Sequence, residues 1–173
     1  MDGRAFLDVA EELSRGATEA HWRAAVGRAY YALMLEGRDL LHRWGFDPPP
    51  RDNVHSFVRL RLLYAADMDL KRAGRILERL VLNRNLADYQ LDLPGEFASA
   101  TRSIEAIRAA GDAISWLDQV NDDPSAAKRR SHRFGPDGVA TASWGRPYSA
   151  RPTTKASAQP ASSPESGGSG GRA

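Results

Sequence analysis

The apolar residues of this chain recur every three or four positions through most of its first 120 residues, which is the spacing of amphipathic helices. No segment shows the two-residue alternation of a half-buried strand. Breaks in the pattern at residues 14–16, 45–50, 65–67 and 92–96 separate five helical runs. The pattern predicts an all-α fold, an up-and-down bundle of four to five helices.

Each helical run begins near a side chain that can accept a hydrogen bond from a free amide of the first turn. For the third and fourth runs two neighbouring residues are equally suitable, and for the fifth a proline follows closely, as is common in a first turn. The expected N-caps are Asp2, Thr18, Asp52 or Asn53, Asp67 or Asp69, and Asp92, the last with Pro94 in the first turn.

The second run is apolar on more than one side. Its main stripe lies within about 40° of one line over six turns, while Tyr31 and Leu35 face away from that stripe. We therefore expect this run to be the central helix, in contact with neighbours on several sides. The stripe consists of Trp22, Val26, Ala29, Leu33, Leu40 and Trp44.

The fourth run, expected to reach about Leu91, has an apolar line that includes two charges. Arg84 and Asp88 lie about 20° to either side of it, and Asn85 and Tyr89 lie on its flank. Two interpretations stay open: an ion pair that fixes helix register, or a polar cleft between helices. The apolar positions on the line are Leu70, Ala73, Leu77, Leu80, Val81 and Leu91.

The composition changes after residue 120. Residues 121–173 are rich in Ser, Ala, Pro and Gly, with too little apolar area to offset the entropy of ordering. They hold 8 Lys and Arg against 4 Asp and Glu, so residues 1–120 have a net charge of −2 although the whole chain has +2. We therefore predict one domain over residues 1–120 and a disordered basic tail over residues 121–173.

Several classes of function lack their usual signatures. The absence of cysteine excludes disulfides and thiolate chemistry. The four histidines have no metal-ligand partner at helical spacing, so no metal site and no cofactor are predicted. No apolar run approaches a membrane span of ~18 residues, and the N-terminus lacks signal-peptide order, which predicts a cytoplasmic protein without membrane contact. Among the histidines, His55 at the start of the third run is the candidate for chemistry.

Three short motifs occur in order on the second, third and fourth runs: Arg-Ala-Tyr-Tyr-Ala-Leu at residues 28–33, then His55, then Arg-Asn-Leu-Ala-Asp-Tyr at residues 84–89. Together they resemble the HEPN superfamily, and in particular its small stand-alone proteins with Ala-Tyr-Tyr-Ala and Arg-x-x-Ala-Asp-Tyr motifs. The resemblance covers roughly residues 3–118. It implies a bundle of four to five helices, usually a homodimer, often paired with a nucleotidyltransferase antitoxin.

The resemblance also implies metal-independent RNA cleavage, which many members of the superfamily carry out with an Arg, a polar neighbour and a His. Arg84 and Asn85 match the first two positions, while the places for the His hold Tyr89 and its next two residues. A His titrates near neutral pH and can take a proton from a ribose 2'-hydroxyl, whereas Tyr, with a pKa near 10, seldom can.

Two functions follow from these residues. The first is a toxin-like endoribonuclease in which Arg84 and Asn85 hold the scissile phosphate, Tyr89 replaces the imidazole and His55 transfers protons. The alternative is a non-catalytic HEPN module that binds RNA, a nucleotide or a partner protein. The candidate binding residues are Arg84, Asp88 and Arg28.

Overall fold

A computed structural model describes residues 2–50, 53–92 and 95–123, and these form five helices and no strand. The predicted all-α class is confirmed. The predicted tail begins two residues too early, because Asn121 and Asp122 still belong to the fifth helix. Residues 124–173 of the predicted tail, with Asp52 and Pro94, lie outside the described residues. The helices are α1 (Gly3–Ser14), α2 (Glu19–Arg43), α3 (Val54–Leu63), α4 (Met68–Tyr89) and α5 (Thr101–Asp122).

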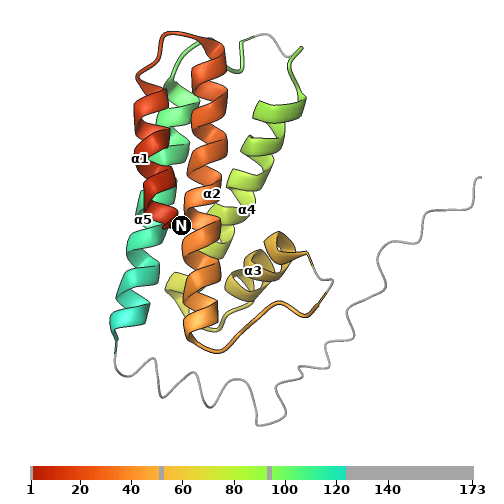
Figure 1. Cartoon of the computed structure of the whole chain (residues 1–173), viewed down its shortest axis with the longest axis vertical. Coiled ribbons are helices and arrows are strands. Elements are labelled where there is room, and N and C mark those ends of the chain that lie inside the picture. Colours follow the sequence, from red (N-terminus) through yellow and green to blue (C-terminus); the bar gives the residue numbers. More distant parts are fainter. Residues whose placement is uncertain (1, 51–52, 93–94, 124–173) are drawn as a thin grey trace, which may run out of the picture. The chain divides into compact units, whose positions relative to one another are not determined.

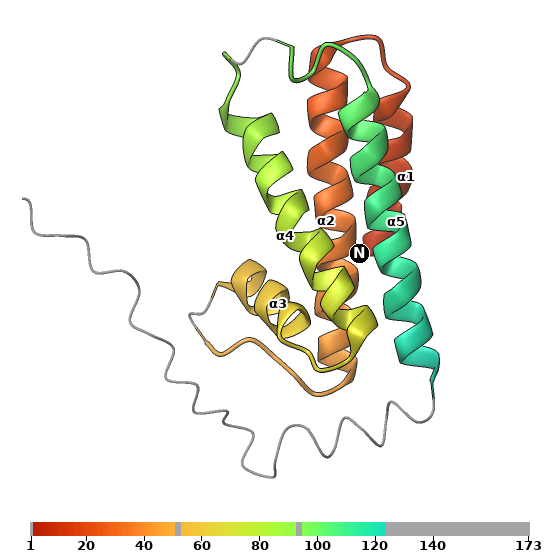
Figure 2. The same ribbon diagram turned by 180° about the vertical axis from the view of Figure 1, so that it is seen from behind.

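Four of the helices, α1, α2, α4 and α5, run alternately up and down (Figure 1). The short α3 is part of the connection from α2 to α4. The reverse view shows α4 and α5 on either side of α2 (Figure 2). Helix α2 contacts each of the other four helices, so its predicted central place is confirmed.

The first four N-caps are confirmed, and both open alternatives are resolved among the described residues. The Asp2 and Thr18 side chains accept from backbone N–H groups of α1 and α2. Asn53 accepts from two N–H groups of α3, and Asp67, rather than Asp69, accepts from two N–H groups of α4. The local sequence thus determines where these helices begin.

The predicted start of the fifth helix is wrong. Helix α5 begins at Thr101 with Ala100 as its N-cap and no capping side chain, so Asp92 is not its cap. Gly95 adopts a φ of +88°, which the right-handed helix does not allow, and turns follow it. Phe97 is only 2% exposed, so it is buried as expected, but from a turn that precedes the helix.

The apolar line of α4 is shorter than predicted. Helix α4 ends at Tyr89, two residues early, so Leu91 is 66% exposed beyond the helix. Leu70, Ala73, Leu77 and Leu80 are buried as predicted. The predicted line is therefore correct in its centre and wrong at its C-terminal end.

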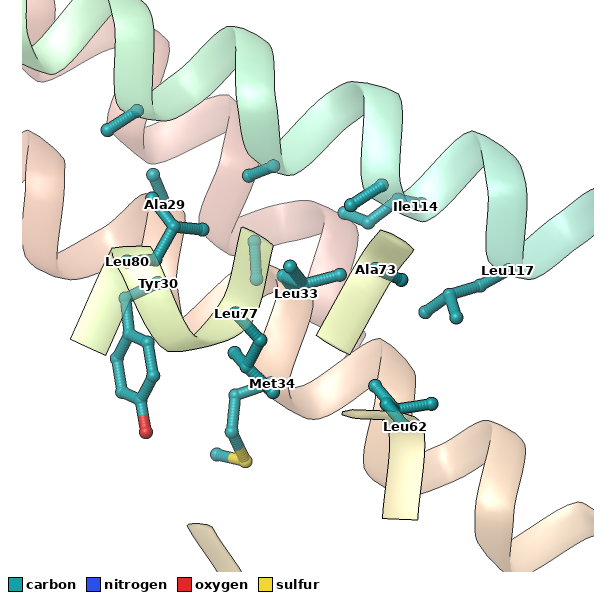
Figure 3. Packing of buried hydrophobic residues seen from close by; sticks show 14 of the residues in the cluster. Ala29, Tyr30, Leu33, Met34, Leu62, Ala73, Leu77, Leu80, Ile114 and Leu117 are labelled. Carbon is teal, nitrogen blue, oxygen red and sulfur yellow. The ribbon is translucent and has the colours of Figure 1, made fainter. Parts of the chain in front are cut away.

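The core is a single cluster built from all five helices (Figure 3). Where α3 meets α4, a Cβ added at Gly74 would lie 2.4 Å from the Leu63 backbone nitrogen, so the two backbones are in direct contact. Gly37 of α2 is similarly close to α3, since a Cβ there would lie 3.1 Å from the side chains of Val58 and Leu62. The close contacts at these two glycines fix the position of α3 and therefore that of His55.

Candidate functional site

Arg84 and Asp88 form the expected ion pair on the side of α4 that faces α2. Arg84 Nε lies 2.6 Å from Asp88 Oδ2, although its N–H is not aligned for a hydrogen bond. Asp88 lies against α2 at Gly27, where an added Cβ would be 3.9 Å from Oδ1. The two side chains are 25% and 36% exposed, so the pair borders the core and remains accessible to water.

Asn85 and Tyr89 extend this polar surface. Arg84 donates a long hydrogen bond of 3.4 Å from Nη1 to Asn85 Oδ1. Its guanidinium carbon lies 5.3 Å from the centre of the Tyr89 ring, a cation-π distance, while Tyr89 as a whole is 70% exposed. The guanidinium is therefore flanked by a carboxylate, an amide and an aromatic ring.

The tyrosines of the Ala-Tyr-Tyr-Ala stretch hold His55 against α2. Tyr30 Oη and His55 Nδ1 are 2.7 Å apart and share a hydrogen bond. The Tyr31 ring meets the imidazole edge-on, with centroids 6.0 Å apart. Figure 3 shows the Tyr30 hydroxyl directed away from the labelled core side chains. Through these contacts, the two tyrosines hold the first turn of α3 at the edge of the core.

Electrostatics link His55 to Arg84. Burial lowers the pKa of His55 below its ordinary value, and the positive charge of Arg84 lowers it further. Burial also raises the pKa of Tyr30, as does its neighbour Tyr31, although Arg84 and Arg59 oppose the shift. At neutral pH His55 is therefore neutral and Tyr30 keeps its proton.

Arg84 keeps its charge. Burial alone lowers the pKa of Arg84, but the Asp88 carboxylate, together with Tyr89 and Tyr31, more than offsets this, so the pKa of Arg84 is raised. Its charge influences His55 and Tyr30 alike. Residues from α2, α3 and α4 thus share one electrostatic environment, and we call this group the Arg84 cluster: Tyr30, Tyr31, His55, Arg84, Asn85, Asp88 and Tyr89.

Arg28 lies beside the cluster. Its guanidinium carbon is 5.7 Å from the centre of the Phe6 ring of α1. Phe6 in turn packs against Tyr31, with ring centroids 6.1 Å apart. The exposed Arg28 therefore adds a positive charge on the α1 side of the Arg84 cluster.

Arg23 was not predicted to matter, yet it holds the end of α4 that carries the site. It is 7% exposed, and its Nη1 donates to three carbonyl oxygens, those of Leu86, Ala87 and Gln90, at 3.0–3.3 Å. Its Nε donates to Glu19 at 2.6 Å, and its guanidinium lies 4.3 Å from the centre of the Phe97 ring. A buried cation on α2 therefore caps α4, whose last carbonyls have no partners within the helix.

Sequence signals for the overlooked residues are weak. Arg23 lies between Trp22 and the apolar Ala25 and Val26, so a charge on the wide apolar side of α2 was its only signal. The contact between Tyr30 and His55 joins residues 25 apart through an irregular connection, which helical periodicity does not describe.

The arrangement combines one fixed cation with one neutral imidazole. A guanidinium can hold a phosphate through paired hydrogen bonds. An imidazole that is neutral at pH 7 can accept a proton at the nitrogen not bonded to Tyr30. Within the described residues, no group of three or more His, Cys, Asp and Glu side chains is arranged to hold a metal ion.

Comparisons with models of protein families, with characterised proteins and with solved structures each gave no match to this chain. In the described part of the chain, no helix combines the length and the apolar character needed to cross a membrane. Function must therefore be inferred from the side-chain chemistry and from the motif resemblance.

Proposed function

We propose that this chain is a HEPN-type, RNA-directed protein of the toxin-like kind, and that the Arg84 cluster cleaves RNA without a metal ion. The observation that carries the proposal is the placement of His55, whose Nδ1 lies 2.7 Å from Tyr30 Oη and whose pKa is lowered by burial and by the charge of Arg84. A phosphate-binding cation beside a proton acceptor is the minimum that this reaction requires.

In the proposed reaction Arg84 binds the scissile phosphate in place of Asp88, and Asn85 adds a polar contact. With Nδ1–H donating to Tyr30, Nε2 of His55 takes the proton of the ribose 2'-hydroxyl. The 2'-oxygen then attacks phosphorus, the bond to the 5'-oxygen breaks, and that oxygen takes up the proton from the His55 imidazolium, directly or through water, which restores the neutral imidazole. The products are a 2',3'-cyclic phosphate and a 5'-hydroxyl. Tyr89 stands where related nucleases have their His and packs on Arg84.

The test is cleavage of a labelled single-stranded RNA by the purified full chain in excess EDTA. Loss of a general base removes about 10²- to 10⁴-fold in rate, so His55→Ala and Arg84→Ala should each fall into this range. His42→Ala is the matched control, because His42 is an exposed histidine that pairs with Asp47. Cleavage that survives His55→Ala unchanged would contradict the assignment.

A second candidate is a non-catalytic module that uses the same cluster to bind RNA, a nucleotide or a partner. It is favoured by the 2.6 Å ion pair, because Asp88 already occupies the cation that a substrate phosphate would need. RNA binding that requires Arg84, with no cleavage by any variant, would select this candidate. Tyr89→His, which restores the spacing of related nucleases, should raise cleavage under the first candidate only.

The proposed assembly is a homodimer in the cytoplasm, paired with a nucleotidyltransferase antitoxin. Both expectations come from the motif resemblance. Sedimentation of the purified chain tests the dimer, and relief of growth arrest by a neighbouring nucleotidyltransferase gene tests the pairing.

A further inference from the structure

The outward face of α4 carries cations that no carboxylate of the helix neutralises. Each acidic residue of α4 already has a partner: Asp69 pairs with Arg72, Glu78 with Arg59 of α3, and Asp88 with Arg84. Arg75 and Arg79 are exposed and form no ion pair with any residue that the structure describes.

These two cations share a line with two exposed apolar side chains. Counted at 100° per residue, Arg75, Arg79, Leu82 and Tyr89 lie within about 40° of one direction. Leu82 is 65% exposed and Tyr89 is 70% exposed. The four residues form the outer stripe of α4, which extends about 21 Å along the helix axis.

The outer stripe is continuous with the Arg84 cluster through Tyr89. The guanidinium of Arg84 lies 5.3 Å from the Tyr89 ring centre, yet most of Tyr89 remains open to solvent. The Tyr89 ring can therefore contact the Arg84 guanidinium and also offer a surface on which a base stacks.

We propose that the outer stripe is the path of single-stranded RNA into the Arg84 cluster, an inference that rests on the proposed function. Arg75 and Arg79 contact successive phosphates, Leu82 contacts a base or sugar, and Tyr89 stacks on the base next to the scissile phosphate. Unpaired cations beside exposed apolar and aromatic groups suit a strand that has both phosphates and unstacked bases. A second copy of the chain fits less well, since the same stripe on a partner offers Arg75 and Arg79 no carboxylate to pair with.

The experiment measures binding of two probes by fluorescence anisotropy to the full chain and its variants. One probe is a single strand of about ten nucleotides, and the other is a dinucleotide that reaches only the cluster. Both carry 2'-O-methyl groups, so that neither is cleaved. Arg75→Gln/Arg79→Gln is compared with Arg15→Gln/Arg108→Gln, which removes the same charge from α5 and the end of α1.

We expect the Arg75→Gln/Arg79→Gln variant to bind the longer strand at least tenfold more weakly at about 0.1 M salt. The slope of log affinity against log salt should fall by about 1.4, the value for two lost phosphate contacts on a single strand. Dinucleotide binding should not change, and the control variant should bind both probes as the unmodified chain does.

An equal loss in the control variant, or an equal loss for both probes, would overturn the RNA path. So would a change in sedimentation of Arg75→Gln/Arg79→Gln without a change in RNA binding, because it would show that the stripe is a protein interface. Arg84→Ala separates the two proposals. If Arg84→Ala abolishes binding of both probes and Arg75→Gln/Arg79→Gln does not weaken binding of either, the RNA path fails and the site stands. If the unmodified chain binds neither probe, both the RNA path and the proposed function fail.

Discussion

The two halves of α4 face the same neighbour, α2, but are held to the bundle in different ways. The first half is held by apolar packing, with Leu70, Ala73 and Leu77 buried and Gly74 in backbone contact with α3. The second half has a partly exposed ion pair on its inner side and is held from its end by Arg23. A helix can therefore present charge at its inner face when a neighbouring helix binds its terminal carbonyls.

The largest effect is expected where the first half is most tightly packed. Leu77→Ala removes a side chain that is 1% exposed and should cost about 2–5 kcal/mol of unfolding free energy. Leu82→Ala, on the outer stripe of the same helix, should cost far less because Leu82 is 65% exposed. Urea unfolding of both variants measures the difference, and similar losses would show that the outer stripe is covered.

The second half should depend on Arg23. Arg23→Met keeps the length of the side chain but removes the donor to the buried carbonyl oxygen of Ala87, which should cost roughly 1–3 kcal/mol. Hydrogen exchange should speed up in the last turn of α4 and not around Leu77. Arg4→Met is the control, since Arg4 pairs with Asp118 at a site where both are about half exposed and should cost under about 1 kcal/mol. Uniform acceleration along α4 would contradict a local role.

The ion pair should contribute little to stability. Arg84→Ala and Asp88→Ala should each cost under about 1 kcal/mol, because water reaches both side chains. RNA binding should nevertheless depend on Arg84. Losses of about 3–5 kcal/mol in the single variants, relieved in the double variant, would mean that the pair is a sealed internal one.

The smallest effect is the pH dependence that comes from His55. Because the pKa of His55 is lowered in the folded chain, the unfolded chain binds more protons once the pH falls below about 6.5. Stability should therefore decline as the pH falls from 6.5 through the lowered pKa. His55→Gln should remove this part of the decline. Identical stability curves from pH 7 to 5 for both proteins would contradict the burial of the imidazole.

The sequence determined the helices well because their signals are local. Asp2, Thr18, Asn53 and Asp67 cap helices through amides within three residues of themselves, and such contacts survive in any tertiary setting. The predicted start of α5 was wrong because the signal that sets it is not local. The position of Phe97 depends on its contact with Arg23, a residue 74 positions earlier.

The same distinction applies to the candidate site. Arg84 and Asp88 were identified because both lie on one helix at a fixed spacing, and the ion pair between them follows from that spacing alone. The nearness of His55 to Arg84 depends on how α3 sits on α2 and α4, which periodicity does not encode. Arg23 was missed because nothing near it in the sequence identifies the helix end that it binds.

Gly74 has a consequence for how this chain can change over generations. Helix α3 packs on α2 at Gly37 and on α4 at Gly74, and the ring centre of Phe46 in the preceding connection lies 5.3 Å from the Arg61 guanidinium carbon of α3. Beyond Phe46, residues 47–50 can therefore be lengthened or shortened without moving His55. A single methyl group at position 74 cannot be accepted in the same way, because it would meet the α3 backbone at 2.4 Å. In any chain that keeps this packing, the length of that loop should vary freely while position 74 stays glycine.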